Sequence, residues 1–395
     1  MRVVVAHCYY DSSLPSGENT AVADELILLS GAGFDVIPLS YSSDGLKASN
    51  SRRIAAVRSV LMASVTDFVA YLESVRPDVV HLHNTIPHPG PGLANAAKKL
   101  KIPVVQTVHN RRLAPCLAGT QFLNGAECTK CAGQRLPWQG VVHACYRGKR
   151  GQSAVVAASF GFHPQGWKGG DHYFAVSAGI ASMLLEQVGI PPSRVSVKAN
   201  PIPDSGVSSL PDRTSFLFAG RLDEAKGLKL LLESWRNLPP LNRPRLVVCG
   251  AGPLAGAVAR AAQQDSSIEF LGQTDPAAVL QEIAASSVVL VPSIGGEGLP
   301  RILAEAFAAG RPVLCTPFDP MASVVAHSAA GWISPAPASA DSFGATLRAV
   351  SASPREVISE KADAARRHYD SNFHPDAVLQ HQLQTYERLV SQAAA

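Results

Sequence analysis

The feature that most constrains the fold of this sequence is an alternation between short apolar runs and longer amphipathic stretches. The runs are rich in β-branched residues, as expected of strands buried on both faces of a parallel sheet. In the first half of the chain they are Arg2–His7, Phe34–Leu39, Asp78–His83, Val104–His109, His172–Val176 and Val195–Lys198. In the second half they are Ser215–Phe218, Arg245–Cys249, Ile268–Leu271, Ser287–Val291, Pro312–Cys315 and Gly331–Ile333. Because this strand–helix pattern occurs twice, we predict an α/β protein with two doubly wound, Rossmann-like domains.

The length of 395 residues also suits two domains better than one compact core. The stretch Asn200–Asp212 is rich in proline and small polar residues, which is typical of a linker. We therefore predict an N-terminal domain over residues 1–200 and a C-terminal domain over residues 201–374. Residues 375–395 have helical spacing and can pack back on either domain, including the N-terminal one. Residues 113–150 are glycine-rich and lack a core pattern, which indicates an insertion.

The charge and hydropathy of the chain exclude some classes of protein. The net charge of +4 is small for this length and gives no support to nucleic-acid binding. The basic clusters Arg111-Arg112 and Arg147–Arg150 are predicted to be solvated, with an anionic acceptor or peripheral contact with a membrane surface left open. No segment approaches the roughly 18 continuous apolar residues of a membrane span. The segment Met1–His7 is interrupted too early for a signal peptide and predicts a buried strand, so we expect a cytoplasmic protein.

Two cations follow the strand Ser215–Phe218. In open α/β sheets, ligands bind beyond the carboxyl ends of the strands. Arg221 and Lys226 lie in such a position, next to Gly220 and other small residues, and they can clamp a diphosphate. The alternative is a surface loop in which Lys226 pairs with Asp223.

Two carboxylates follow the strand Ser287–Val291. A glycine-rich loop containing Glu297 runs into a predicted helix, and Glu305 lies about two turns further on. Both carboxylates can accept hydrogen bonds from hydroxyls of one elongated ligand. Alternatively, Glu297 only provides a negative charge that complements the helix dipole. This interpretation does not explain Glu305.

These motifs together resemble a known family. The pair Gly220-Arg221 and Lys226-Gly227, followed by Glu297 and Glu305 with seven residues between them, is similar to the retaining glycosyltransferases of GT-B fold in family 4, also called group 1. The resemblance covers nearly the whole chain. It implies two domains that face each other across a cleft, with a nucleotide diphosphate sugar bound by the C-terminal domain.

The resemblance also implies roles for individual residues of the donor site. Arg221 and Lys226 would neutralise the diphosphate, Glu297 would bind hydroxyls of the transferred sugar, and Glu305 would bind the ribose. Backbone amides of Gly298 and Leu299 would add donors. In the N-terminal half, Gly17 would approach a phosphate through the loop Tyr9–Asn19, although relatives usually have two adjacent glycines where this chain has Ser16-Gly17. His109 would orient the donor sugar, and His83 is assigned to the acceptor side; a histidine satisfied at a strand end is the alternative for His109.

The expected reaction follows from the same resemblance. Such enzymes retain the anomeric configuration without a protein nucleophile, and the leaving phosphate accepts the acceptor's proton. Catalysis then depends on positioning and charge stabilisation, with no divalent ion or other cofactor required. We expect transfer of a hexose, with uracil favoured over guanine as the base of the donor. The acceptor is a lipid, a polysaccharide or a small molecule.

A second glycine-rich loop follows the strand Arg245–Cys249. Gly250, Gly252 and Gly256 nearly match the dinucleotide fingerprint, but the third glycine comes one residue late. The acidic residue that a dehydrogenase needs at the end of the next strand is missing, because Glu269 lies inside that strand. By the family resemblance, Gly250 and Gly252 lie near the donor nucleotide.

Four cysteines occur within the insertion: Cys116, Cys128, Cys131 and Cys145. A Cys-x2-Cys pair with one more cysteine on each side has the spacing of a tetrahedral zinc site. We expect a structural zinc without a catalytic role, in an insertion that helps to select the acceptor. Four reduced thiols or an adventitious disulfide are the alternatives.

Two other functions stay open at this point. A sugar-nucleotide 2-epimerase of the same fold needs additional acidic residues in the N-terminal domain, which the sequence does not locate. A non-catalytic subunit that binds a nucleotide sugar would not require His109 together with both glutamates and both cations. Fold analogy alone does not establish activity.

Overall fold

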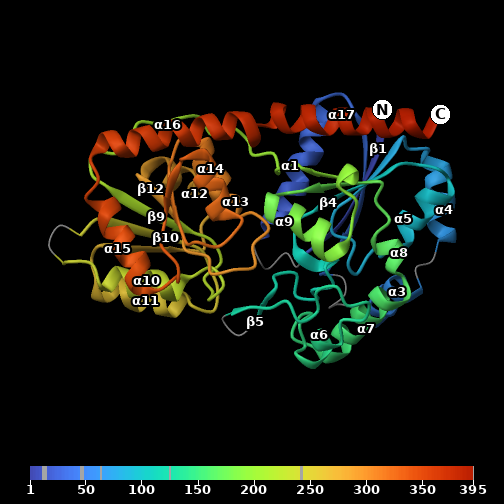
Figure 1. Cartoon of the computed structure of the whole chain (residues 1–395), viewed down its shortest axis with the longest axis horizontal. Coiled ribbons are helices and arrows are strands. Elements are labelled where there is room, and N and C mark those ends of the chain that lie inside the picture. The colour runs from blue at the N-terminus through green and yellow to red at the C-terminus, as the bar shows by residue number, and fades with distance from the viewer. Residues whose placement is uncertain (11–15, 45–48, 63–64, 124–125, 241–242, 395) are drawn as a thin grey trace. The chain divides into compact units, whose positions relative to one another are not determined.

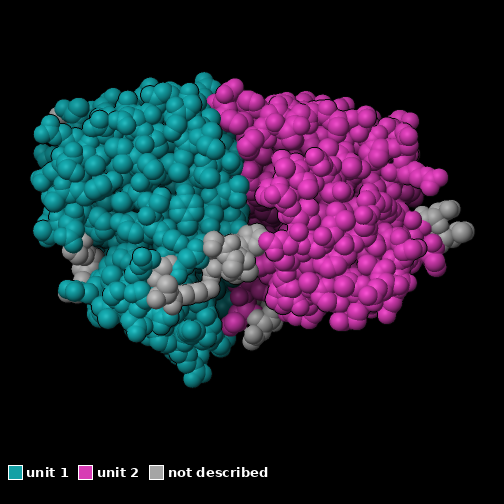
Figure 2. All heavy atoms as spheres, turned by 180° about the vertical axis from the view of Figure 1, so that it is seen from behind, with its two compact units in different colours: residues 1–121, 128–201, 378–395 teal, residues 122–127, 202–377 magenta. Residues whose placement is uncertain are grey.

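The computed structural model describes residues 1–10, 16–44, 49–62, 65–123, 126–240 and 243–394. The chain divides into two compact units, coloured separately in Figure 2. Unit 1 comprises Met1–Gln121, Cys128–Pro201 and Val378–Ala395, and unit 2 comprises Phe122–Glu127 and Ile202–Ala377. The main division therefore falls within one residue of the boundary expected from the sequence. Part of the expected insertion, Phe122–Glu127, groups with unit 2.

Unit 1 is built on a parallel sheet of six strands (Figure 1). The strand order is β2 (Asp35–Ser42), β1 (Arg2–Tyr9), β3 (Val79–Leu82), β4 (Val104–Val108), β7 (His172–Ala175) and β8 (Val195–Val197). The helices before and between these strands are α1 (Gly17–Gly31), α3 (Asn50–Met62), α4 (Thr66–Val75), α5 (Gly92–Lys99), α6 (Trp138–Val142), α7 (Arg150–Phe162), α8 (Pro164–Trp167) and α9 (Ala178–Met183). The segment between β4 and α6 contains a two-stranded antiparallel hairpin, formed by β5 (Phe122–Leu123) and β6 (Ala126–Glu127).

Unit 2 has a second parallel sheet of six strands, so the predicted doubly wound fold is confirmed for both halves. The order is β11 (Ile268–Gly272), β10 (Arg245–Cys249), β9 (Ser215–Ala219), β12 (Val288–Val291), β13 (Val313–Cys315) and β14 (Gly331–Ile333). The helices are α10 (Leu228–Arg236), α11 (Ala255–Gln264), α12 (Pro276–Ala285), α13 (Arg301–Ala308), α14 (Met321–Ser328), α15 (Ala340–Ser351) and α16 (Arg355–Asn372). The strand order reverses between β9 and β12, and the loops after these two strands lie at the position where doubly wound sheets bind ligands.

The final helix, α17 (Pro375–Ala394), closes the core of unit 1. Its Tyr386 and Leu389 are buried against Val3, Val105 and Phe174 of the sheet. In Figure 1 this helix, drawn in red, runs beside α1 and the strands of unit 1. Burial of an aromatic and a leucine side chain contributes about 1.5–3 kcal/mol each. The C-terminal helix is therefore part of the N-terminal fold.

Among the described residues, no single helix is long and apolar enough to cross a bilayer. The segments Asn50–Leu61 and Thr66–Val75 meet the length and composition criterion only as a pair, and they are bent by 90° at the break between them.

Candidate functional site

Glycines pack the loop after β10 against the loop after β9. Gly250 has a φ of +139°, and a Cβ atom there would lie 1.9 Å from the carbonyl oxygen of Gly220. Gly252 is similarly close to the backbone of Leu222, whose N–H donates to the carbonyl of Ala251 at 2.9 Å. Side chains cannot be accommodated at such distances. The predicted donor glycines Gly220, Gly250 and Gly252 therefore lie together at the carboxyl edge of the sheet of unit 2.

Another glycine brings the loop after β9 onto the loop after β12. Gly227 has a φ of +72°, and a Cβ atom there would lie 1.7 Å from the carbonyl oxygen of Pro292. The N–H of Ile294 donates to the carbonyl of Ala225 at 3.0 Å, which joins the same two loops. Two segments far apart in the sequence thus share one backbone surface at the point where the strand order reverses.

The side chains of Lys226 and Glu297 meet at this junction. Lys226 Nζ lies 2.6 Å from Glu297 Oε1, and the two side chains are 25% and 18% exposed. Glu297 also accepts a hydrogen bond from Ser293 Oγ at 3.3 Å. The alternative in which Lys226 pairs with Asp223 through its side chain is wrong, because the Lys226 ammonium pairs with Glu297 and Asp223 accepts the backbone N–H of Lys226, at 3.0 Å. A cation and a carboxylate side by side can bind adjacent anionic and hydroxyl groups of one ligand.

The second predicted cation, Arg221, belongs to the same loop. Its guanidinium is half-exposed and pairs with Asp223. The carboxylate of Asp223 thus contacts Arg221 through one oxygen and the Lys226 backbone through the other. This contact holds the loop while leaving much of the Arg221 side chain accessible to a ligand.

Glu305 has a different partner from Glu297. It lies on α13, where Arg301 Nε is 2.6 Å from Glu305 Oε1, an i,i+4 ion pair. Gly298 and Leu299 lie in the segment that enters α13, just before Pro300. Glycines 295 and 296 precede them with φ values of +148° and +76°. The structure therefore places Glu305 on the same loop-and-helix unit as Glu297, with its charge balanced by arginine.

In unit 1 the predicted histidine His109 follows β4 and is partly buried. Its Nε2 lies 2.9 Å from Nδ1 of His83, which is buried. Loss of hydration lowers the pKa of His109 to about 4, although the charge of Glu18 opposes this shift. The imidazole is therefore neutral at pH 7 and able to donate or accept a hydrogen bond. His83, assigned to the acceptor side from the sequence, lines the same small cavity as His109.

The residues around His109 include several that the sequence analysis missed. Gly17 is the first residue of α1, which is capped by Ser16, and residues 11–15 of the predicted phosphate loop lie outside the described residues. The next residue, Glu18, accepts hydrogen bonds from Tyr10 at 3.0 Å and from Asn110 at 3.2 Å. A small cavity of about 40 Å³ is lined by Glu18, His109, Asn110 and other residues. The only sequence signal for these positions was their place just after β1 and β4.

A buried polar network lies deeper in unit 1. Lys198 Nζ is 3.0 Å from Glu25 Oε2, and both side chains are fully buried. Gln382 of α17 donates to Glu25 Oε1 at 2.7 Å, and His81 Nδ1 is 3.1 Å from the same oxygen. Burial would raise the pKa of Glu25, but the charges of Lys198 and His81 hold it well below its usual range.

The same carboxylate belongs to a potential metal-binding cluster. Within the described part of the chain, Glu25, His81 and His83 are the group whose potential ligand atoms all lie within 4.8 Å of one another. Lys198 already supplies a positive charge beside Glu25, so the carboxylate has a counter-ion without a metal. We interpret this cluster as the polar anchor of α17 on the sheet.

The four cysteines of the insertion converge in unit 1 but are spaced more widely than that cluster. Burial raises the pKa of Cys145, and the neighbouring thiols of Cys116, Cys131 and Cys128 raise it further. All four are partly buried thiols without a disulfide.

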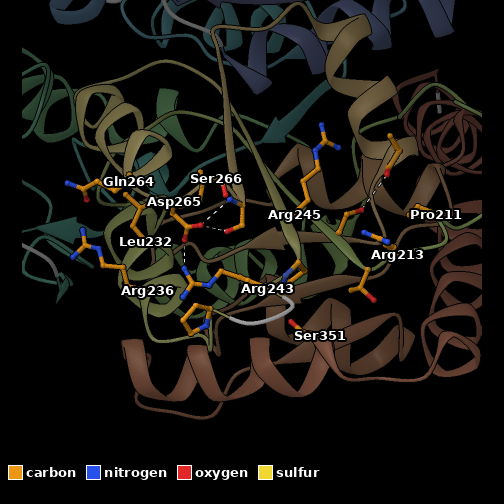
Figure 3. A pocket seen from close by; sticks show the side chains of 18 residues that line it. Pro211, Arg213, Leu232, Arg236, Arg243, Arg245, Gln264, Asp265, Ser266 and Ser351 are labelled. Atoms are coloured by element: carbon orange, nitrogen blue, oxygen red, sulfur yellow. Dashed lines mark hydrogen bonds and ion pairs between the residues drawn. The ribbon is translucent and has the colours of Figure 1, made fainter.

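A large cavity of unit 2 lies at the other edge of its sheet. It has a volume of about 1300 Å³ and is lined by residues at the start of β9, β10 and β11, including Ser215, Arg245 and Ile268. Figure 3 shows Arg213, Arg236, Arg243 and Arg245 around it, with Arg243 paired to Asp265. The loops that carry Lys226 and Glu297 follow the opposite ends of the strands, so this cavity is separate from the candidate site.

The chain is similar to several known proteins in sequence or in fold. A phosphatidyl-myo-inositol mannosyltransferase of Mycobacterium leprae is 32% identical over 162 residues, which cover 38% of this chain and 42% of that protein. The match thus spans about two fifths of the length of the relative.

Two solved structures share the fold at low identity. Sucrose-phosphate synthase from Thermosynechococcus elongatus has a TM-score of 0.70 at 16% identity, covering 99% of both chains. Anabaena HepE in complex with UDP has a TM-score of 0.66 at 14% identity, covering 98% of this chain and 100% of that one.

Family models match both halves of the chain. The model described as Glycosyltransferase Family 4 matches residues 17–205, and the model described as Glycosyl transferases group 1 matches residues 206–367. The two matches are contiguous, and the fold neighbours are of the GT-B type expected from the sequence. The chain therefore belongs to the group 1 glycosyltransferases.

Proposed function

We propose that this protein transfers a hexose from a uridine diphosphate sugar to a hydroxyl group of a lipid or polysaccharide, with retention of the anomeric configuration. The observation that carries the proposal is the contact between Lys226 and Glu297 at the point where the strand order of unit 2 reverses. A diphosphate and the sugar attached to it are adjacent anionic and hydroxyl-rich groups. Side chains of matching chemistry lie side by side here.

The proposal assigns a role to each residue, as the family resemblance implies. Lys226 and Arg221 hold the diphosphate and stabilise the charge that develops on it as the bond to the sugar breaks. Glu297 accepts hydrogen bonds from sugar hydroxyls, and Glu305, held by Arg301, is assigned to the ribose. His109 is neutral at pH 7 and is assigned to orienting the sugar.

The reaction balances without a protein nucleophile. The bond between the anomeric carbon and the diphosphate oxygen breaks, and the acceptor oxygen bonds to the same face of that carbon. The acceptor's proton passes to an oxygen of the leaving diphosphate. Catalysis then consists of positioning the two reactants and stabilising the leaving group. We propose that no divalent ion is needed for this step, as the family resemblance implies.

The donor and acceptor classes are supported by relatives. HepE, which shares the fold, was crystallised with UDP, and this supports uracil as the base. The mycobacterial relative is named as a mannosyltransferase acting on phosphatidyl-myo-inositol, which supports a hexose donor and a lipid-linked acceptor. These assignments distinguish the proposal from a transferase of small soluble acceptors.

A donor panel tests the proposal. Purified protein is incubated with UDP-glucose, UDP-galactose, UDP-N-acetylglucosamine or GDP-mannose and with lipid and polysaccharide acceptors, and nucleotide release is measured. We expect release of UDP and, by NMR, an α-linked product from an α-linked donor. A β-linked product contradicts retention, and turnover of GDP-mannose alone contradicts uracil. Conversion of the donor to its 2-epimer identifies the epimerase instead, and binding without any turnover identifies a non-catalytic subunit.

A further inference from the structure

The four cysteines of unit 1 come from three separate stretches of the chain. Cys116 lies before the β5–β6 hairpin, Cys128 and Cys131 follow it, and Cys145 follows α6. None of them belongs to the site of sugar transfer described above. The fold nevertheless brings these stretches together through two backbone groups, those of Gln121 and Gly140.

Gln121 connects the first two cysteines. Its backbone N–H donates to the sulfur of Cys116 at 3.2 Å, and its carbonyl accepts the N–H of Cys128 at 2.7 Å. The hydrogen bond between Cys128 and Gln121 also closes the base of the hairpin. Cys116 and Cys128 thus lie on either side of one residue, although 11 residues separate them in the sequence.

Gly140 lies beside the other two cysteines. Its carbonyl accepts the N–H of Cys145 at 2.8 Å. Burial raises the pKa of the Cys131 thiol, against the effect of the nearby Gly140 backbone. A Cβ atom at Gly140 would lie 2.7 Å from Leu117 Cδ1, so this backbone packs directly on the residue after Cys116. The two pairs of cysteines are therefore joined through the contact between Leu117 and Gly140.

The hydrogen bond to the sulfur of Cys116 has a chemical consequence. A backbone N–H that points at a cysteine sulfur favours the thiolate over the thiol. Such donors are typical of the groups that surround metal-bound thiolates and orient them. Here the sulfur of Cys116 has one, from Gln121.

The segment around the cysteines has little apolar packing of its own. Its regular elements are α6 with five residues and the hairpin strands with two residues each. The large apolar side chains of Leu136, Trp138 and Val142 are about half-exposed. Leu113, Leu117 and Tyr146 pack this segment on the core of unit 1, and a bound metal would add stability to the part between them.

We propose that Cys116, Cys128, Cys131 and Cys145 bind one zinc ion in a closed, tetrahedral, structural site. Four sulfur ligands that include a Cys-x2-Cys pair suit zinc, and such sites supply stability and no chemistry. Each coordinating thiol releases its proton to solvent when the ion binds. The ion holds the base of the β5–β6 hairpin and the segment up to Cys145.

Metal analysis of the full-length protein tests the proposal. The protein is expressed in zinc-supplemented medium, purified with a reductant, and measured by inductively coupled plasma mass spectrometry. We expect one zinc per chain, and we expect Cys128→Ser and Cys145→Ser to lose it. Two matched controls keep the ion: Lys130→Ala, which changes an exposed residue between two proposed ligands, and Cys249→Ser, which changes a buried cysteine of unit 2.

Two measurements on the unmodified protein keep the test independent of whether the variants fold. After the zinc is removed with a mercurial reagent, cobalt(II) should restore the structure and give the absorption bands of a tetrahedral thiolate complex. A strong chelator should lower the melting temperature of the wild type. Zinc-free protein whose four thiols react with a thiol reagent in the native state overturns the proposal. So do a disulfide in this set, and iron in place of zinc.

Discussion

Lys226 and Glu297 form an ion pair of 2.6 Å between two loops that follow different strands of one sheet. The pair exists because Gly227 lets the loop after β9 approach the carbonyl of Pro292, at the start of the loop after β12. Without a ligand the two charges neutralise each other. Under the proposed function, a phosphate of the bound sugar nucleotide would take the place of the carboxylate beside Lys226, and Glu297 would accept hydroxyls of the sugar.

Replacement of Glu297 by glutamine should separate catalysis from nucleotide binding. Glutamine keeps the shape of the side chain but removes the charged acceptor for the sugar hydroxyls, so we expect kcat to fall by about 10²-fold. Affinity for UDP, which lacks the sugar, should stay the same or rise, because Lys226 loses a competing partner. Steady-state kinetics and calorimetric titration with UDP measure the two effects. Glu224→Gln, at an exposed residue paired with Lys229, is the control. A larger loss of UDP affinity than of turnover would reject the assignment of Glu297 to the sugar.

Two glycine-to-alanine variants should have opposite effects on stability. Gly227→Ala places a Cβ atom at a φ of +72° and 1.7 Å from a carbonyl oxygen, so we expect a loss of at least about 2 kcal/mol and weaker UDP binding. Gly256→Ala lies in helix α11, where the nearest atom is 3.6 Å away on the flexible side chain of Arg260. Alanine there should stabilise by about 0.5–1 kcal/mol. Urea unfolding measures both, and equal stability of the two variants contradicts the packing described for the loops.

Replacing only one member of the buried pair of Glu25 and Lys198 should strongly lower the stability of unit 1. Lys198→Met leaves an uncompensated buried carboxylate and should destabilise unit 1 by about 3–5 kcal/mol. Adding Glu25→Gln removes the charge and retains an acceptor for Gln382, so the double variant should be more stable than Lys198→Met alone. Urea unfolding of the two variants provides the comparison. A double variant that is no more stable would show that the cost comes from packing and not from charge.

Acidification should weaken the folded state through His109. Its pKa is about 4 in the folded protein and about 6.5 in an unfolded chain. Between these values the unfolded state binds more protons, so the free energy of unfolding should rise with pH from 4 to 6.5, and the gain should then level off. His83 and His7 have pKa values lowered in the same direction by burial and add to this slope. Urea unfolding at several pH values should show that the free energy of unfolding of His109→Gln depends less on pH than that of the wild type. An unchanged pH dependence would contradict the lowered pKa of His109.

Much of the fold could be predicted from the sequence because buried parallel strands are apolar on both faces. All twelve predicted runs correspond to strands, with ends shifted by a few residues, as at β2, which extends to Ser42. The donor motifs were also accessible, because Arg221, Lys226 and Glu297 directly follow strands. The position of each on a loop at the carboxyl edge follows from the doubly wound order.

The contacts that depend on tertiary packing could not be predicted. Lys198, Glu25 and Gln382 have no periodic pattern in common and meet only because α17 returns to unit 1. Glu18 and Asn110 follow different strands, and neither belongs to a motif that carries chemistry alone. The contact between His83 and His109 has the same origin, because a histidine at a strand end can face either the solvent or a neighbouring strand.

Calorimetric titration of UDP into the wild type, Lys226→Ala and Lys229→Ala tests the central claim most directly. Lys226 lies at the proposed diphosphate site. Lys229, three residues further along the chain, is exposed and pairs with Glu224. Loss of a charge-assisted hydrogen bond costs about 1.5–3 kcal/mol, so Lys226→Ala should weaken UDP binding by about 10- to 150-fold. Lys229→Ala should bind UDP like the wild type. Equal affinity of all three proteins for UDP would contradict the assignment of this site to the nucleotide sugar.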